Sequence, residues 1–266
     1  MLANCLIVGA PKAGTTALAN YLATHEDVFL PSCKEPRYLC YQELLKSCRE
    51  DNLKEDILQD SVRAYEDYVS LYSNDAMIRI DASVQYLFYY DTVIKKLKDL
   101  GMNPFIIIVL RDPVDRAISN WKYNFHDRRP LGRAIKDELE GRMAEYNSFW
   151  KYLEQGSYYN SVQSYLDSFE AVHLIQYDEF LSNPLKVVND ILLKLNLHPL
   201  KDLPTKRINK TLPYYSWNLN IISLKSQKRL LRLLSMYNLE EFLFKKKEAS
   251  LETKKLINLY YENKVK

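Results

Sequence analysis

Leu6-Ile-Val-Gly-Ala-Pro-Lys-Ala-Gly-Thr-Thr-Ala-Leu18 has the pattern of a buried strand, a tight turn and the start of a helix. Such a turn aims backbone N–H groups and the positive end of a helix at an anion, usually a phosphate. Gly9 and Gly14 are spaced as in Gly-x-x-x-x-Gly-Lys-[Ser/Thr], where a lysine after the second glycine reaches the β- and γ-phosphates. Here Thr15 stands in that lysine position, and Lys12 lies inside the loop. The stretch therefore suits a compact 5′-phosphate better than a triphosphate.

Strand-like and helix-like segments alternate along the rest of the chain. This order predicts an α/β fold, a P-loop-like three-layer sandwich with a central parallel sheet flanked by helices. Asp112 followed by Pro113 is typical of the N-cap and first residue of a helix. The charged, poorly periodic segment 126–156 predicts an arm over the site, and the lack of a repeat or linker predicts a single domain, residues 1–266. We expect strands at 5–8, 28–30, 77–80, 104–110 and 172–176, and helices at 15–24, 62–72, 89–100, 113–125, 157–169, 184–195, 221–237 and 251–261.

Charge and composition exclude some classes of function. The 37 basic and 34 acidic residues leave a net charge of only +3, which makes no electrostatic case for a nucleic-acid partner. The four cysteines form no Cys-x-x-Cys pair and the four histidines show no ligand spacing, so we predict no metal site. No apolar run reaches the roughly 18 residues of a membrane helix, and no signal peptide precedes the first strand.

Three stretches together resemble the sulfotransferases that use 3′-phosphoadenosine 5′-phosphosulfate (PAPS). Pro11-Lys-Ala-Gly-Thr-Thr16 followed by Leu18 is similar to their 5′-phosphosulfate loop, and Ile106-Ile-Ile-Val-Leu-Arg-Asp-Pro-Val-Asp-Arg-Ala-Ile-Ser119 to their 3′-phosphate motif. Lys34-Glu-Pro-Arg-Tyr38 resembles a segment of the carbohydrate, heparan-sulfate-like branch. The resemblance covers roughly residues 3–200 and follows the family order. It implies PAPS as sulfuryl donor, 3′,5′-adenosine bisphosphate as product, a hydroxyl of a glycan or oligosaccharide as acceptor, and no metal.

The resemblance also implies roles for the residues that would hold the nucleotide. Lys12 would neutralise the departing 5′-phosphate, or alternatively only offset its charge in the ground state. Arg111 and Ser119 would hold the 3′-phosphate. Lys206 and Arg207 lie in a basic loop that would close over the same phosphate, or is simply solvated. The remaining residues of the 5′-phosphate loop are Pro11, Ala13, Gly14, Thr15 and Thr16, of which Thr16 is also a candidate helix cap.

The acceptor side of the predicted site begins after the second strand. Glu35 is the candidate general base, because the carboxyl ends of parallel strands bring it to the edge where the phosphate loop lies. A free glutamate has a pKa near 4.3, so burial or a neighbouring carboxylate would have to make it an effective base. Asp81 would assist Glu35 or a sugar hydroxyl, or alternatively cap a helix. The predicted acceptor contacts are Lys34, Arg37, Ser83 and Tyr86, while Ala82 stands where the carbohydrate branch often carries a lysine.

Two other functions fit parts of this pattern. A Mg²⁺-dependent P-loop kinase of a nucleotide or sugar would require the lysine that Thr15 replaces. A non-catalytic PAPS-binding protein would be expected to lack Lys12 or Glu35, and both are present. Sulfotransferases of the eukaryotic secretory pathway carry a membrane anchor, so the resemblance without an anchor implies a cytosolic, bacterial enzyme. Neither the oligomeric state nor the identity of the acceptor is indicated by the sequence.

Overall fold

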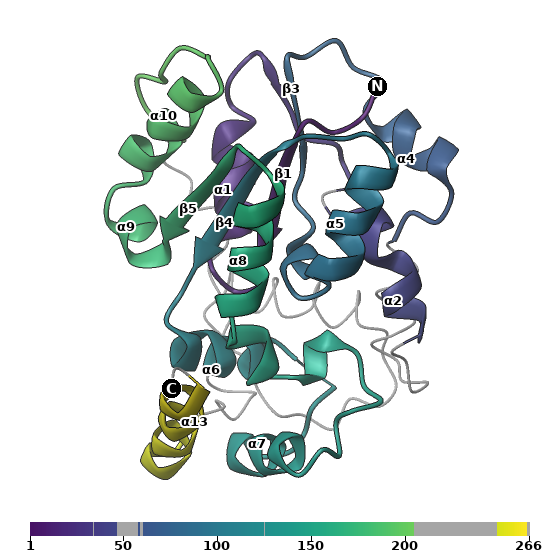
Figure 1. Ribbon diagram of the computed structural model, residues 1–266. Coiled ribbons are helices and arrows are strands. Elements are labelled where there is room, and N and C mark those ends of the chain that lie inside the picture. Colours follow the sequence, from purple (N-terminus) through teal and green to yellow (C-terminus); the bar gives the residue numbers. More distant parts are fainter. Residues whose placement is uncertain (34, 47–57, 59–60, 125, 205–248, 265–266) are drawn as a thin grey trace, which may run out of the picture.

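The central sheet decides where every loop of the protein lies. The computed structural model describes residues 1–264 except 34, 47–57, 59–60, 125 and 205–248. Within these residues the sheet has five strands in the order β2-β3-β1-β4-β5, and all neighbours pair in parallel. The predicted parallel sheet is therefore confirmed (Figure 1). The strands are β1 (Cys5–Gly9), β2 (Val28–Phe29), β3 (Ile78–Asp81), β4 (Phe105–Leu110) and β5 (Val172–Gln176).

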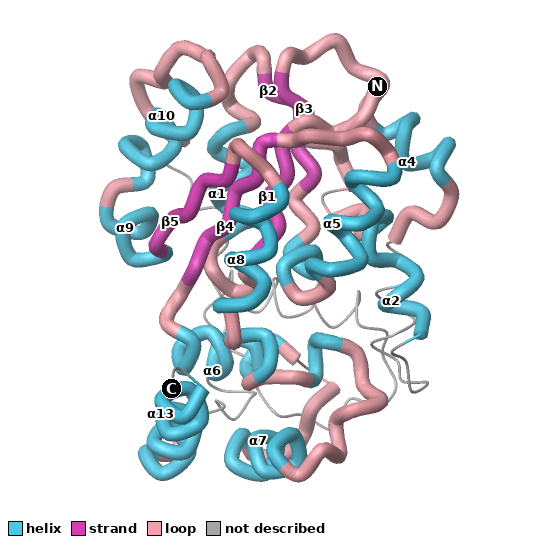
Figure 2. The backbone as a smooth tube through the Cα atoms, in the orientation of Figure 1, coloured by secondary structure: helices cyan, strands magenta, loops and turns pink. Residues whose placement is uncertain are grey.

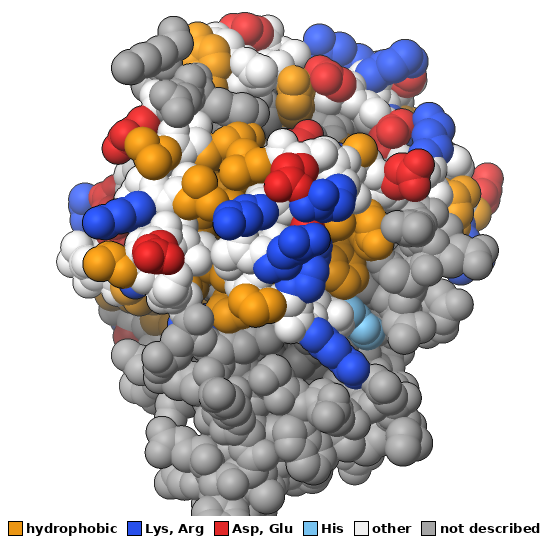
Figure 3. All heavy atoms as spheres, turned by 90° about the horizontal axis from the view of Figure 1, so that it is seen from below, with side chains coloured by type: hydrophobic (Ala, Val, Ile, Leu, Met, Phe, Trp, Pro, Cys, Tyr) orange, Lys and Arg blue, Asp and Glu red, His pale blue; other side chains and the backbone are white. Residues whose placement is uncertain are grey.

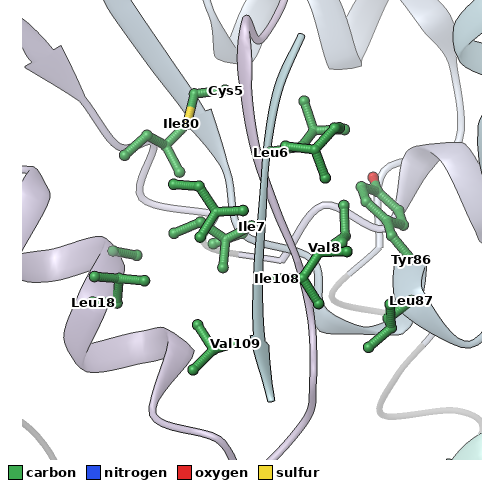
Figure 4. Close-up of a cluster of buried hydrophobic side chains, with 14 of the residues drawn as sticks. Cys5, Leu6, Ile7, Val8, Leu18, Ile80, Tyr86, Leu87, Ile108 and Val109 are labelled. Atoms are coloured by element: carbon green, nitrogen blue, oxygen red, sulfur yellow. The ribbon is translucent and has the colours of Figure 1, made fainter. Parts of the chain in front are cut away.

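Helices cover both faces of this sheet, as the three-layer prediction requires. The helices α1 (Thr15–Leu22) and α10 (Pro184–Lys194) pack together on one face, and α5 (Tyr90–Asp99) and α8 (Tyr159–Ser168) on the other (Figures 1 and 2). All of β1 is buried, because side chains on both of its faces meet helices. In Figure 4, Ile7 and Leu18 lie on one side of the strands, and Leu6 and Tyr86 on the other. This two-sided burial explains the continuous apolar sequence of β1 and β4.

A second, smaller core lies beyond the carboxyl ends of the strands. It is formed by α6 (Pro113–Tyr123), α7 (Leu131–Leu139) and α13 (Leu251–Lys264), which pack around Trp121, Ile135 and Ile257 (Figure 1). The prediction of a poorly periodic arm over 126–156 was therefore wrong. That segment contains α7 and the 3₁₀ turns η3 (Ser148–Trp150) and η4 (Glu154–Gly156).

Buried polar groups explain why this segment looked irregular in the sequence. Arg116 is fully buried in α6 and donates to the Tyr152 carbonyl and to Gln155 Oε1. Glu138 accepts hydrogen bonds from the backbone N–H groups of Leu153 and Glu154, and burial raises its pKa to about 7. Charged side chains that satisfy backbone groups from inside a core remove the apolar periodicity on which the prediction depended.

Shorter elements complete the described chain. The 3₁₀ turn η1 (Tyr38–Cys40) leads into α2 (Tyr41–Lys46), and α4 (Tyr65–Leu71) precedes β3. The turn η2 (Val84–Leu87) follows β3, and α9 (Tyr177–Ser182) follows β5 directly. The sequence did not predict α9, because six residues are too few to show a helical period. The helix predicted at 221–237 lies outside the described residues. No described helix is long and apolar enough to cross a bilayer.

Candidate active site

The strand order brings the predicted motifs to one edge of the sheet. Because β1 lies between β3 and β4, with β2 beside β3, the loops that follow these four strands are neighbours at their carboxyl ends. Ligands of open parallel sheets bind at this edge. The arrows of β4 and β5 point toward α6 in Figure 1. Figure 3 shows from below the outer surface beyond this edge, where lysine and arginine side chains gather near the middle of the face.

The loop after β1 has the geometry of an anion cradle. Gly14 is the N-cap of α1 with φ 79°, and no side chain caps the helix, so Thr16 is not its N-cap. A Cβ on Gly14 would lie 3.1 Å from the Tyr177 ring, so this position requires glycine for both backbone and space. The Ala10 N–H donates to the Val109 carbonyl at 2.7 Å, which ties the loop to β4. The N-terminus of a helix presents backbone N–H groups and a positive partial charge, which suit an anion.

Lys12 and Arg111 are brought together across this loop. Arg111 Nη1 donates to the Lys12 carbonyl at 2.9 Å, and the guanidinium carbon lies 4.7 Å from the centre of the Tyr177 ring. Lys12 has φ 69°, and its Nζ lies 3.7 Å from the centre of the Tyr123 ring at the end of α6. Two aromatic faces thus hold the two cations in place. Tyr123 was expected among the aromatic residues flanking the cleft, whereas Tyr177 was not predicted as a site residue, since nothing local in the sequence links it to the loop.

The rest of the predicted 3′-phosphate site is less completely described. Asp112 caps α6 by accepting from the Asp115 N–H at 2.8 Å, with Pro113 in the first turn, as predicted. Ser119 is half-buried in α6 and, in the described part of the chain, makes no bond to Arg111. Its role stays a prediction. Lys206 and Arg207 lie outside the described residues.

Glu35 lies where the acceptor base was predicted, in the loop after β2. Its Oε2 accepts from Arg37 Nη2 at 2.8 Å, and the side chains are 19% and 13% exposed, respectively. An arginine at this distance favours the charged carboxylate, so this partner of Glu35 is not the neighbouring carboxylate that was expected to strengthen it as a base. Arg37, predicted as an acceptor contact, thus holds the candidate base. Lys34 lies outside the described residues.

Asp81, Ser83 and Tyr86 form a buried network beneath this loop. All three side chains are fully buried. Asp81 Oδ1 accepts from Ser83 Oγ at 2.6 Å, and Oδ2 accepts from the hydroxyls of Tyr86 and Tyr68, each at 2.9 Å. Burial raises the pKa of Asp81 to about 6, although the three hydroxyl donors oppose that shift. The roles of Asp81 as a catalytic assistant and of Ser83 and Tyr86 as acceptor contacts stay predictions. The structure places all three side chains in the core.

A histidine pair lies at the opposite edge of the sheet, before β2. His25 and His198 are far apart in the sequence, yet His25 Nε2 and His198 Nδ1 are 3.2 Å apart and Asp27 lies beside them. The Asp27 N–H donates to His25 Nδ1, which places the proton of a neutral His25 on Nε2, facing His198. The 3.2 Å contact between the rings has the length of a direct hydrogen bond, and a metal bound to His25 Nε2 would have to displace the proton of that bond.

The parallel sheet, the loop after β1 with Gly14 at its end, and the helix α1 that follows define a P-loop-like α/β protein. The profile of the Sulfotransferase family matches residues 5–202. The chain belongs to this family, as the motifs predicted.

Curated relatives and solved structures agree with this placement. The chain is 24% identical over 215 residues to the bifunctional heparan sulfate N-deacetylase/N-sulfotransferase 1 of Caenorhabditis briggsae, and 23% identical over 227 residues to the heparan sulfate glucosamine 3-O-sulfotransferase 5 of Mus musculus. These matches cover 74% and 83% of this chain, which spans 23% and 61% of the two relatives. The sulfotransferase of Alicyclobacillus acidocaldarius has the same fold, with a TM-score of 0.68 and 24% identity over 96% of this chain and 99% of that one. The sulfotransferase domain of the curacin biosynthetic pathway matches with a TM-score of 0.52 and 18% identity over 79% of each chain.

Proposed function

We propose that this protein transfers the sulfuryl group of PAPS to a hydroxyl of a carbohydrate acceptor, with residues 1–266 acting as one domain. The observation that supports the proposal is the strand order, which brings the loops that carry three groups to one edge of the sheet. These are Lys12 in the loop after β1, Arg111 at the end of β4, and Glu35 after β2. One edge thus offers cations for a phosphate-bearing donor and a carboxylate for the acceptor proton.

The residues at the loop fit a donor of the PAPS type. Gly14 leaves room where a Cβ would meet Tyr177, and the N-terminus of α1 faces the same loop. Lys12 and Arg111 add two positive charges, joined through the Lys12 carbonyl. PAPS would supply an activated sulfuryl group on a 5′-phosphate leaving group. Lys12 with the α1 N-terminus would bind the 5′-phosphate, and Arg111 with Ser119 the 3′-phosphate.

The chain's own groups then have separate tasks in an in-line transfer. The acceptor oxygen forms a bond to sulfur while the bond from sulfur to the phosphate oxygen breaks, and the phosphate keeps the electron pair. Lys12 Nζ neutralises the negative charge that develops on the departing phosphate oxygen. Glu35 accepts the proton of the acceptor hydroxyl, and Arg37 holds it as the carboxylate until then.

A carbohydrate acceptor is favoured by the relatives and by the base. Both curated relatives are named for heparan sulfate, a glycan. The small-molecule branch of the family typically uses a histidine base, and the histidine after the β4 motif is His126. Its backbone N–H donates to Asn124 Oδ1 at 3.1 Å. No motif around His126 marks it as that base, so a phenol-type mechanism has less support. The cytosolic location and bacterial origin stay predictions.

The decisive experiment is transfer from labelled PAPS to panels of glycans and phenols, with Glu35→Gln as the test variant. Turnover of a glycan should fall at least about a hundredfold, the low end for a general base. Affinity for 3′,5′-adenosine bisphosphate should stay unchanged. Glu43→Gln in α2 is the matched control, because this glutamate pairs with Lys46 at 3.1 Å in a solvent-exposed i,i+3 pair.

Other outcomes would replace the proposal with a named alternative. Sulfation of phenols that His126→Ala abolishes and Glu35→Gln leaves intact would overturn both acceptor class and base. Thermal stabilisation by ATP–Mg²⁺ and not by 3′,5′-adenosine bisphosphate would favour the kinase. Tight binding of the bisphosphate with no transfer to any acceptor would favour a non-catalytic PAPS-binding protein.

A further inference from the structure

The loop that carries Glu35 is bonded to the buried end of β3. The Arg37 N–H donates to Ser83 Oγ at 3.0 Å, and the Leu39 N–H donates to the Tyr86 hydroxyl at 3.3 Å. These two amides lie two and four residues after Glu35, where the loop turns into η1. Arg37 itself has φ 52°, a left-handed backbone that a non-glycine residue keeps only when its surroundings hold it.

Asp81 decides how these two hydroxyls are oriented. Ser83 and Tyr86 each donate their single proton to the Asp81 carboxylate, which leaves their lone pairs for the N–H groups of the loop. A carboxylate can only accept hydrogen bonds, so it imposes one direction on the whole chain of bonds. No cationic side chain among the described residues forms an ion pair with Asp81. The hydroxyls are therefore its stabilising partners, and a third comes from Tyr68.

The last link leads from the backbone of Arg37 to the base. The guanidinium of Arg37 donates to Glu35 Oε2 at 2.8 Å, so the residue whose N–H is held by Ser83 also holds the carboxylate. The far side of the loop is held as well. Lys96 Nζ donates to the Tyr38 carbonyl at 3.2 Å, and the Tyr38 ring stacks on Tyr68 with centroids 4.5 Å apart.

We propose that Asp81, Ser83 and Tyr86 are positioning residues that set the backbone of the Glu35 loop and so aim the Glu35 carboxylate, rather than contacts to the sugar. The inference rests on the proposed function for its catalytic consequence, since Glu35 must be the base. It differs from the prediction made from the sequence, which put Ser83 and Tyr86 against the acceptor. Both hydroxyls are fully buried, and each donates to Asp81 and accepts from one backbone N–H of the loop. They are therefore occupied by the loop and not by an acceptor.

A double-mutant cycle between Ser83 and Glu35 tests the catalytic half. Ser83→Ala should lower kcat by about tenfold to a hundredfold, the range for a displaced reacting group, without raising the acceptor KM. In the Glu35→Gln background the same change should cost less than about twofold, because groups that act as a unit are not additive. Ser83→Thr, which keeps the hydroxyl, should restore turnover. Ser70→Ala on exposed α4 is the control, since its hydroxyl bonds only to the carbonyl of Asp67.

Hydrogen exchange tests the structural half without relying on activity. Ser83→Ala should speed exchange of the Arg37 amide, and Tyr86→Phe that of the Leu39 amide, each by about tenfold or more, while amides of α10 stay protected. Unchanged exchange in both variants would overturn the inference. So would multiplicative effects in the cycle, or a raised acceptor KM at constant kcat, which would return Ser83 to the sugar site. Full turnover of Glu35→Gln with faster Arg37 exchange in Ser83→Ala would instead refute the proposed base and leave the link between β3 and the loop standing.

Discussion

Gly14→Ala probes the phosphate loop with a built-in control elsewhere in the chain. Gly14 and Gly101 both have left-handed backbones, with φ 79° and 65°. An alanine in this conformation costs about 1–2 kcal/mol of folding free energy at either site. At Gly101 the new Cβ meets nothing within 4 Å, whereas at Gly14 it lies 3.1 Å from Tyr177 Cε2 and 3.3 Å from Phe180 Cε1. Such overpacking adds about 1–3 kcal/mol at Gly14 only.

The difference between the two variants is therefore the measurement. Urea unfolding should show Gly14→Ala losing about 2–5 kcal/mol in total and Gly101→Ala about 1–2 kcal/mol, from the two costs above. Because the Cβ of Gly14 would push against α9 at the start of α1, calorimetry should also show weaker binding of 3′,5′-adenosine bisphosphate. We expect a loss of about tenfold or more, equivalent to 1.4 kcal/mol, with Gly101→Ala within about twofold of the parent.

Two results would refute this reasoning. Equal losses of stability would mean that the space behind Gly14 is not limiting. Unchanged nucleotide affinity in a folded Gly14→Ala protein would mean that the loop after β1 does not hold the phosphate.

Three further predictions concern the nucleotide, the metal and pH. Arg111→Ala should weaken binding of 3′,5′-adenosine bisphosphate by a few kcal/mol and that of 5′-AMP much less, as expected when one charge of a pair is lost; equal losses in calorimetry would contradict the 3′-phosphate role. Transfer should persist in EDTA, because Lys12 rather than Mg²⁺ neutralises the leaving group; activity that disappears and returns with Mg²⁺ would count against this mechanism. The pKa of Asp81 is raised by burial from 3.8 to about 6, so its contribution to stability is full below its unfolded pKa and is lost as the pH rises through 6. The loss is about 3 kcal/mol. Asp81→Asn should reduce the fall of unfolding free energy between pH 4 and 7 and leave the part due to Glu138, whose pKa is raised to about 7. An unchanged slope would contradict the shift.

Local patterns predicted the backbone of the site well. The β1–α1 loop, the buried β4 and the Asp112-Pro113 start of α6 were each predicted from the sequence and lie where expected. Each depends on neighbours in the sequence, such as a glycine at a left-handed position or a proline in the first turn. The family followed from the same motifs, because each motif is a run of consecutive residues that can be recognised without the tertiary structure.

Predictions failed where side chains act across long separations. Segment 126–156 was expected to be a poorly periodic arm, but the fully buried Arg116 and the half-buried Glu138 satisfy backbone groups of η4 and its neighbours. Charged residues in a buried role mimic a solvated surface in the sequence. The pairing of His25 with His198 was missed for the same reason, since the spacing rule for ligands sees only nearby residues.

The sequence by itself determined the strands, the main helices that flank them, the parallel sheet and the residue types available at its carboxyl edge, because strand and helix periods and turn chemistry are written in consecutive residues. Only the tertiary structure decided which of those residues contact one another and which are buried. The order β2-β3-β1-β4-β5 joins Lys12 to Arg111 and Arg37 to Ser83, pairs that are 99 and 46 residues apart. Burial then separates Asp81 and Tyr86, which the core encloses, from Glu35, which stays partly exposed. Both outcomes depend on how distant segments pack, and no pattern of neighbouring residues contains that information.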